Sequence, residues 1–333
     1  MAQDQEQLTT IEKALAGLPP DFAFFADRFR TQICPKLEAR EADRIAAVKR
    51  QRNFGIAAVA VFALFTGFGF FFFHHPFGAF LGGVSAFGLY SWGSAKLNAL
   101  GRETKEMLVE PVCHEFGMTF EVSPLDPADI MTFRNLKLVP HWDRARYEDR
   151  LTGQRQNAPF EFFEAHLEEK HETSSRNGRR TEWVTVFRGQ CLVARFPKPF
   201  NGVTRVVRDQ GAFNFLSKLG EDLPRVKLED PVFEKAFEVY GSDQIEARFI
   251  LTPDFMERLL SLEKTFEGKK LRCAFSGGEM YLCVEGKNLF EPGSMYRRMD
   301  DLSRVREMLT DFAAVFLLID SMVERRTPEA LRT

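Results

Sequence analysis

Two charge-free stretches decide the architecture of this chain. The first is NFGIAAVAVFALFTGFGFFFF, from Asn53 to Phe73, and the second is FGAFLGGVSAFGLYSWGSA, from Phe77 to Ala95. A helix rises about 1.5 Å per residue, so about 20 apolar residues cross the roughly 30 Å hydrocarbon core of a bilayer. Each stretch reaches about that length, and in lipid only a helix satisfies all its own backbone hydrogen bonds. The sequence therefore predicts two membrane-spanning helices, separated by His74-His75-Pro76.

Two other interpretations of these stretches fit the sequence less well. Core helices of a soluble protein are disfavoured because Phe70 to Phe73 is a run of four phenylalanines that leaves no polar face for water. A secretory signal is disfavoured because about fifty mostly polar residues come before the first stretch. We therefore expect N-terminal helices over 1–52, a transmembrane helical hairpin over 53–95 and a folded domain over 96–333.

The distribution of basic residues predicts the orientation of the hairpin. Basic residues lie on both outer flanks and are missing from the connector; those on the flanks are Lys36, Arg40, Arg44, Lys49, Arg50, Arg52, Lys96, Arg102 and Lys105. Because basic residues near membrane ends stay in the cytoplasm, both termini are predicted to be cytoplasmic. The five cysteines, an odd number with no paired spacing, also fit a reducing compartment.

The overall composition excludes several classes of protein. The 333 residues suffice for one large domain or two ordinary ones, and 45 Lys plus Arg nearly balance 47 Asp plus Glu. A wholesale nucleic-acid binder would show a strong basic excess, so no nucleic acid is expected as a partner. With 44% hydrophobic and 28% charged residues, the chain is neither disordered nor a polytopic transporter.

Small residues recur on the second stretch at Gly78, Gly82 and Ala86. Small side chains at four-residue spacing let two helices approach closely. One interpretation is that this face packs on the first stretch within the same hairpin. The other is a contact between copies of the chain, in a homo-oligomer or a small pore. Neither stretch carries an ionisable side chain, which argues against a proton or ion relay in the membrane.

Helices are predicted before the first stretch. Leu8, Ile11, Leu15 and Leu18 repeat at helical spacing. Asp21 is typical of an N-cap for a second helix with Phe22, Phe25 and Phe29 on one side, and Pro35 is expected to break or kink that helix. From Lys36 to Arg52 acidic and basic residues alternate, as on a solvated helix.

The chain after the hairpin shows a mixture of helix and strand patterns. Helical spacing continues to about Met118, and Asp126-Pro127, Asp230-Pro231 and Thr252-Pro253 are helix starts. The predicted strands are 119–122, 163–168, 183–196, 203–207, 237–240, 245–251, 271–275 and 280–284. Because the strands come as hairpins with short helices between them, we expect an α+β domain with a mainly antiparallel sheet.

The predicted hairpin about Gly277-Gly278 contains two cysteines. A two-residue loop would pair Cys273 with Leu282, whereas a three-residue loop would pair Cys273 with Cys283. Neither spacing resembles a zinc knuckle. Both thiols are expected to be buried and structural.

The C-terminal part contains a regular apolar stripe over 302–323. Its members recur at steps of three and four residues and are Leu302, Val305, Leu309, Phe312, Phe316, Ile319 and Val323. The apolar face is wider than a two-stranded coiled-coil seam, so a long helix that packs in a bundle or on the sheet is expected. An oligomer interface through Phe312 and Phe316 is the alternative.

Motifs that carry chemistry are missing from the sequence. There is no P-loop, no dinucleotide-binding glycine motif, no nucleophile elbow and no His-Glu-x-x-His pair. No catalytic, cofactor-binding or metal-ligating residue is therefore predicted, and an enzyme is the less favoured class. Residues that could contact a partner or line a groove are Arg176, Arg179, Arg180, Asp243, Glu246 and Arg248.

One run resembles a known family. LEDPVFEKAFEVYGSDQIEARFILTP, from Leu228 to Pro253, is similar to the signature of the bacterial membrane-protein family named domain of unknown function 3137. Phe187-Arg-Gly189 resembles the Phe-x-Gly strand of that family, and Ile33-Cys-Pro-Lys-Leu37 resembles its pattern ahead of the paired spans. The likeness extends from about Asp21 to Phe290. It implies an inner-membrane protein with two spans and a cytoplasmic C-terminal domain, but no activity, cofactor or site residues.

Three functional hypotheses follow from the sequence. The favoured one is a membrane-anchored, cytoplasm-facing binding or scaffold protein whose partners are the lipid bilayer, a cytoplasmic or membrane protein, and further copies of the chain. The second is an enzyme at the membrane face, with a groove near Asp243, Glu246 and Arg248. The third is a small oligomeric pore.

Overall fold

The computed structural model describes residues 11, 13, 16–73, 77–127, 130–175, 178–196, 200–208, 223–265 and 270–323. Leu8 and Leu15 of the predicted first helix and the His74-His75-Pro76 connector lie outside these residues. The chain forms two compact units, one of Met1–Val112 with Phe290–Asp311 and the other of Cys113–Leu289 with Phe312–Thr333. The stretch Phe290–Asp311 thus belongs with the N-terminal helices and not with the sheet.

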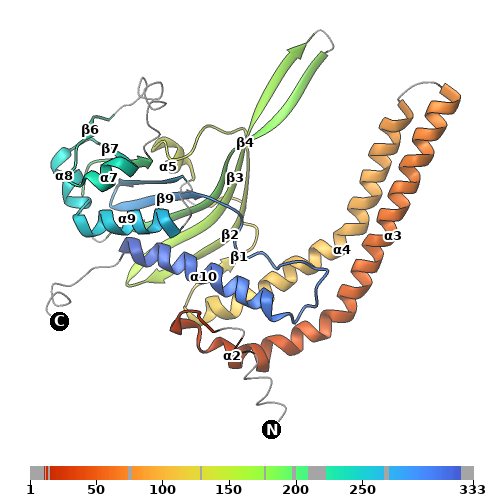
Figure 1. The fold of residues 1–333 in the computed structure, drawn as a ribbon, viewed down its shortest axis with the longest axis horizontal. Helices are drawn as coiled ribbons and strands as arrows, with labels where there is room; N and C mark the ends of the chain where they lie inside the picture. Colours follow the sequence, from red (N-terminus) through yellow and green to blue (C-terminus); the bar gives the residue numbers. More distant parts are fainter. Residues whose placement is uncertain are drawn as a thin grey trace. The chain divides into compact units, whose positions relative to one another are not determined.

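Two long helices dominate the first unit (Figure 1). A 3-10 turn, η1 (Pro20–Phe22), and a short helix, α2 (Phe25–Arg28), lead into α3 (Cys34–Phe73), and α4 (Phe77–Glu115) runs back beside α3. A long segment after the sheet and the first half of α10 (Leu302–Val323) complete this unit.

The start of α3 corrects one prediction and sharpens another. Pro35 does not end the helix, but the helix is distorted just before it, where a π-helical turn, η2 (Phe29–Ile33), leads directly into α3. That wide turn contains residue 31, whose carbonyl group a proline ring at position 35 would meet in a regular α-helix. Asp21 is not an N-cap, since it lies inside η1 and α2 begins after Phe24.

Small residues allow α3 and α4 to pack closely as an antiparallel pair. A Cβ atom at Gly78 would overlap the carbonyl oxygen of Phe65, and one at Gly93 would overlap the side chain of Phe54. In the charged part of the two helices, Ala47 of α3 packs with Leu97 and Leu100 of α4. Only glycine permits this separation of the helices at both points of contact.

One helix of the described residues, over 20–72, is long and apolar enough to cross a membrane by length and composition. Only 11% of its most apolar 18-residue window is buried, which is unlike a core helix of a soluble protein. Helix α4 does not meet the same criterion. Its first half is rich in Gly, Ser and Ala, whose hydropathy is lower than that of the Phe, Val and Leu in α3.

The second unit is built on an antiparallel sheet. Among the described residues the sheet has nine strands in the order β1-β2-β3-β4-β9-β8-β5-β7-β6. The strands are β1 (Thr119–Glu121), β2 (Arg144–Arg155), β3 (Ala158–Ser175), β4 (Gly178–Arg195), β5 (Thr204–Arg208), β6 (Arg225–Val226), β7 (Phe237–Gly241), β8 (Leu271–Ser276) and β9 (Glu279–Glu285). The mixed α+β class with an antiparallel sheet and a C-terminal helix is confirmed.

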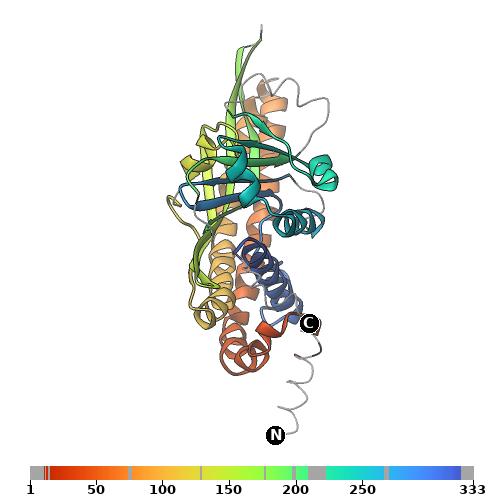
Figure 2. The same cartoon turned by 90° about the vertical axis from the view of Figure 1, so that its left-hand side faces the viewer.

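Helices cover both faces of this sheet, α5 (Ile130–Asn135) on one side and α9 (Pro253–Thr265) on the other (Figure 2). On the first face, the ring of Phe133 meets those of Phe163 and Tyr281 edge-on, with centroids 6.0 and 5.5 Å apart. On the second face, Phe255 of α9 meets Phe275 at 5.7 Å. Two aromatic layers therefore enclose the sheet.

Local sequence signals placed most of these elements. Asp230 caps α7 (Pro231–Ala236), accepting hydrogen bonds from the amides of Val232 and Phe233 at 2.8 and 3.0 Å. The β8–β9 loop has two residues, so Cys273 pairs with Leu282. All five cysteines are free, and only Cys34 is not buried.

One predicted strand is a helix. Residues 245–251 fall in α8 (Gln244–Ile250), because Asp243 accepts hydrogen bonds from the amides of Ile245 and Glu246 at 2.7 and 3.2 Å and so begins a helix. The strands β2 and β6 have no counterpart in the sequence prediction.

The Phe-x-Gly strand generates a stability prediction. A Cβ atom at Gly189 would overlap the carbonyl oxygen of Val284 and lie 2.8 Å from the Cα of Glu285 in the paired strand β9. The substitution Gly189→Ala should therefore lower the free energy of unfolding of the full-length protein by about 3 kcal/mol, the upper end of overpacking costs.

Gly153→Ala is the matched control, since its Cβ would meet the flexible side chain of Met118 at 2.8 Å. We expect that variant to lose less than about 1 kcal/mol. Chemical denaturation in detergent compares the two, and equal losses would contradict the backbone-clash argument.

Candidate functional site

The outer surface of the α3–α4 pair is apolar. The exposed fractions of Phe70, Phe71 and Phe87 are 75%, 78% and 74%. Further exposed apolar side chains on the two helices are Ile56, Val59, Phe62, Leu64, Phe65, Phe68, Phe72, Phe77, Phe80, Leu81, Val84 and Trp92. Soluble monomers rarely expose apolar patches of more than a few hundred Å². A contiguous surface of this kind is suited to lipid or to another apolar partner.

A cluster of cationic, polar and aromatic side chains lies where the apolar surface begins. The guanidinium of Arg50 lies 5.5 Å from the ring centroid of Phe54 and 5.0 Å from that of Trp92. The side-chain amide of Gln51 donates to the hydroxyls of Tyr90 and Ser94 at 3.4 and 3.1 Å. Amphipathic rings with a basic neighbour are typical of a membrane–water interface.

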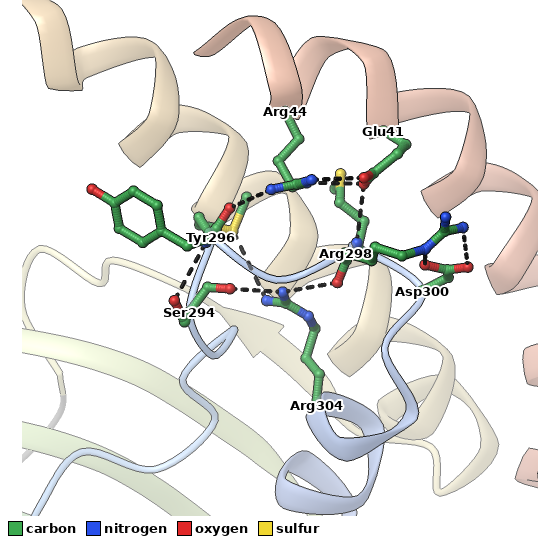
Figure 3. A network of polar contacts seen from close by, with 9 residues as sticks. Glu41, Arg44, Ser294, Tyr296, Arg298, Asp300 and Arg304 are labelled. Atoms are coloured by element: carbon green, nitrogen blue, oxygen red, sulfur yellow. Dashed lines mark hydrogen bonds and ion pairs between the residues drawn. The ribbon is translucent and has the colours of Figure 1, made fainter. Parts of the chain in front are cut away.

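On the N-terminal side of this cluster along α3, an ion pair holds the segment that follows the sheet (Figure 3). The guanidinium of Arg44 donates twice to Glu41, at 2.9 and 2.7 Å, and once to the carbonyl of Met295, at 3.0 Å. Glu41 also accepts from the amide of Met299 at 3.1 Å. The hydrogen bonds from Arg44 lower the pKa of Glu41, so this carboxylate stays ionised at neutral pH.

A buried arginine shapes the same segment from within. Arg304 donates to the carbonyls of Ser294 and Arg298 at 3.0 and 3.2 Å, and burial lowers the pKa of its guanidinium (Figure 3). The hydroxyl of Tyr296 donates to Gln51 on α3 at 2.6 Å. We call residues 290–304 the return segment. These hydrogen bonds join it to the helix pair.

Asp311 lies in α10 and contacts Phe290, the first residue of the return segment. Its carboxyl group accepts from the amide of Phe290 at 2.8 Å. Burial, with Glu307 and Glu291 nearby, raises the pKa of Asp311 to about 6, against the opposing effects of the Phe290 amide and Lys105. A carboxyl with this pKa changes charge in the physiological range.

The small residues of α4 contact α3. A Cβ at Gly78 would overlap Phe65, and one at Gly82 would lie 3.0 Å from the Cβ of Phe65. Ala86 lines a groove along the same helix pair. Gly78 and Gly82 thus pack against α3, as the first interpretation of the spacing expects. A contact between copies of the chain stays a prediction.

The proposed groove residues of the sheet unit have separate partners. Asp243 caps α8, and the carboxylate of Glu246 accepts from the amides of Asn201 and Gly202, each at 2.6 Å. Arg248 donates to the carbonyl of Lys227 at 3.3 and 3.2 Å. Each side chain therefore fastens a different piece of backbone.

The remaining candidate residues differ in what the structure describes. Phe312 and Phe316 are buried, and Phe316 packs edge-on against Phe116 with centroids 4.8 Å apart. Both side chains pack in the core of the sheet unit, and an oligomer interface through them stays a prediction. Arg176 lies outside the described residues, and for Arg179 and Arg180 the structure describes only their place in β4.

A group of acidic residues was not predicted. Carboxylate oxygens of Glu148, Asp149 and Glu164 lie within 4.8 Å of one another. Three carboxylates could serve a hard divalent cation, but Glu164 accepts from the amide of Leu289 at 2.6 Å and Glu148 from Asn288 at 2.7 Å. In the alternation of this strand, Phe163 faces one side of the sheet and Glu164 the other. The sequence pattern does not show that the side of Glu164 is also buried.

The family model described as Protein of unknown function (DUF3137) matches residues 185–323. The resemblance to the DUF3137 family is confirmed. The match to DUF3137 includes Phe187-Arg-Gly189 and the run from Leu228 to Pro253, whereas Ile33–Leu37 lies outside it.

No curated protein matches the chain. Among solved structures, the crystal structure of the mycobacterial trehalose monomycolate transport factor A, TtfA, is similar at 11% identity, covering 68% of this chain and 98% of that chain with a TM-score of 0.29.

Asp311 generates a pH prediction. Because the pKa of Asp311 is higher in the folded than in the unfolded state, the protonated carboxyl stabilises the fold. This stabilisation is fully present below pH 3.8 and is lost as the pH rises through about 6. Asp311→Asn keeps an acceptor for the Phe290 amide without the charge. Relative to this variant, the wild type should lose on the order of 2 kcal/mol of unfolding free energy between pH 4 and 7, after allowance for partial exposure.

Thermal unfolding of both full-length proteins in one detergent, across that pH range, measures the difference. Parallel curves would show that the carboxyl titrates as it does in water.

Proposed function

We propose that this protein is a two-span membrane protein that tethers a cytoplasmic sheet domain for binding or scaffolding. The observation that carries the proposal is the exposed apolar surface of the α3–α4 pair. Fully burying one large apolar side chain is worth about 1.5–3 kcal/mol, and this surface holds many of them, including Phe70, Phe71 and Phe87. A bilayer removes such a surface from water on all sides.

The second span is supported by packing more than by hydropathy. In lipid, helix pairs associate through small residues that let backbones approach, as Gly78 and Gly82 do against Phe65. If α3 alone crossed the bilayer, the exposed Phe80 and Phe87 of α4 would have to face water while their neighbours held α4 against α3. Inserting both helices avoids that cost.

The proposed orientation places both ends in the cytoplasm, at a bacterial inner membrane. It rests on the basic flanks, on the basic-free connector and on the DUF3137 resemblance. The cation–aromatic contacts of Arg50 with Phe54 and Trp92 lie at the end of the pair where a membrane–water interface is expected.

A tethering role is supported by the course of the chain. The sheet unit leaves the helix unit after Val112 and returns to it at Phe290, and the return segment is held by Glu41, Arg44 and Gln51. A domain joined to its membrane anchor at both ends suits the binding of a cytoplasmic or membrane protein at the membrane face.

Lysine substitution tests each span separately. A Lys at the centre of a span costs about 2.5–3.5 kcal/mol on insertion. Leu64→Lys in α3 and Val84→Lys in α4, at side chains 68% and 58% exposed, should each reduce the carbonate-resistant membrane fraction severalfold. Ile45→Lys is the matched control, because Ile45 is 54% exposed but lies in the charged part of α3. If the Val84→Lys protein stays in the membrane fraction as fully as the Ile45→Lys protein, the proposal that α4 crosses the bilayer is rejected.

Cysteine labelling tests the orientation. Lys49→Cys and Lys96→Cys, each at an exposed position in a Cys34→Ser background, should react with a membrane-impermeant maleimide in inverted vesicles but not in intact spheroplasts. Labelling of either position in spheroplasts would reject the proposed topology.

A further inference from the structure

An apolar groove runs along the α3–α4 pair at its basic end. Its volume is about 780 Å³, and its lining includes Ile56, Val59, Phe62, Ala86 and Phe87. Arg52 and Tyr90 line the same groove and are the only side chains of its lining with polar groups. We propose that this groove is a binding site for one anionic glycerophospholipid of the cytoplasmic leaflet. The inference rests on the proposed membrane anchor.

The length of the groove fits one leaflet. Ten residues separate Arg52 from Phe62 on the same helix, a rise of about 15 Å. Half of the roughly 30 Å hydrocarbon core is the same length. An acyl chain that follows the groove would therefore begin at Arg52 and end near the middle of the bilayer.

The charge at the entrance selects the headgroup. Arg52 is exposed and presents a guanidinium, whose paired N–H donors match the oxygens of a phosphate. The Tyr90 hydroxyl accepts from Gln51 at 3.4 Å and can donate its own hydrogen to a phosphate oxygen. No carboxylate belongs to the groove lining. An anionic headgroup is thus favoured over a zwitterionic one, whose ammonium group would face the same cationic rim.

The site also touches the return segment through one polar chain. Gln51 binds Tyr90 with its amide nitrogen and accepts from the hydroxyl of Tyr296 with its oxygen, at 3.4 and 2.6 Å. A headgroup that engages Tyr90 is therefore two hydrogen bonds away from the segment that follows the sheet. Its binding should strengthen that attachment.

Native mass spectrometry of the full-length protein, extracted in mild detergent, tests the site. The probes are phosphatidylglycerol and phosphatidylcholine with identical acyl chains, added in equal amounts. Wild type should retain one phosphatidylglycerol in clear preference to phosphatidylcholine, and Arg52→Gln should lower the retained phosphatidylglycerol about fivefold. Lys49→Gln is the matched control and should change retention little, since it removes an exposed charge that lies less than one helical turn from Arg52 but does not line the groove.

A second pair of variants separates the acyl-chain site from the headgroup site. Ala86→Phe fills the groove and should reduce retention of both lipids, whereas Ala60→Phe adds the same bulk at an exposed position outside the groove lining and should not. Equal retention of the two lipids by wild type, or equal losses in Arg52→Gln and Lys49→Gln, would overturn the lipid site. A carbonate-resistant wild type in that case would leave the membrane anchor intact, whereas extraction of wild type by carbonate would overturn both.

Discussion

The first unit depends on one constraint, the change from a charge-free to a charged surface along two continuous helices. In the part of the pair that follows Arg52 in α3, small residues of α4 occupy the contact between the helices, and bulky side chains lie on the outer surface. On the N-terminal side of Arg52 in α3, the ion pair of Arg40 with Glu103, at 2.5 Å, joins the same two helices. The two halves of each helix therefore need different surroundings, and Arg50, Gln51 and Trp92 mark the boundary.

The charged half of the helix pair provides the attachment for the return segment. Arg44 and Glu41 bind each other and also backbone groups of Met295 and Met299. Because both side chains are partly buried, loss of either one would leave a charge without its partner, which costs far more than the pair itself contributes. The attachment therefore depends on the geometry of a few hydrogen bonds rather than on a large buried area.

The sequence predicted those parts of the structure whose determinants are local. Asp230 next to Pro231 begins a helix, and Gly277-Gly278 closes a hairpin, although the sequence left its register open between two loop lengths. Local signals failed where distant residues decide: β2 is a strand because it pairs with β1 and β3, although its alternation is obscured by charged residues. Ile245, Ala247 and Phe249 alternate like a strand, yet the Asp243 cap makes the segment helical. The acidic group and the return segment both depend on contacts more than one hundred residues apart in the chain.

The small residues of α4 explain why hydropathy and packing give different answers for that helix. Each glycine that lets α4 approach α3 also replaces a side chain that would have raised the mean hydropathy of the span. Tight packing at Gly78, Gly82 and Gly93 thus lowers the very quantity by which a span is recognised. Where the small residue is Ala86 and the opposite side chains are Ile56 and Val59, the helices do not close fully and a groove is left. The glycines of α4 therefore lower the hydropathy of the span that we propose, and the groove at Ala86 is where we propose that a lipid chain lies.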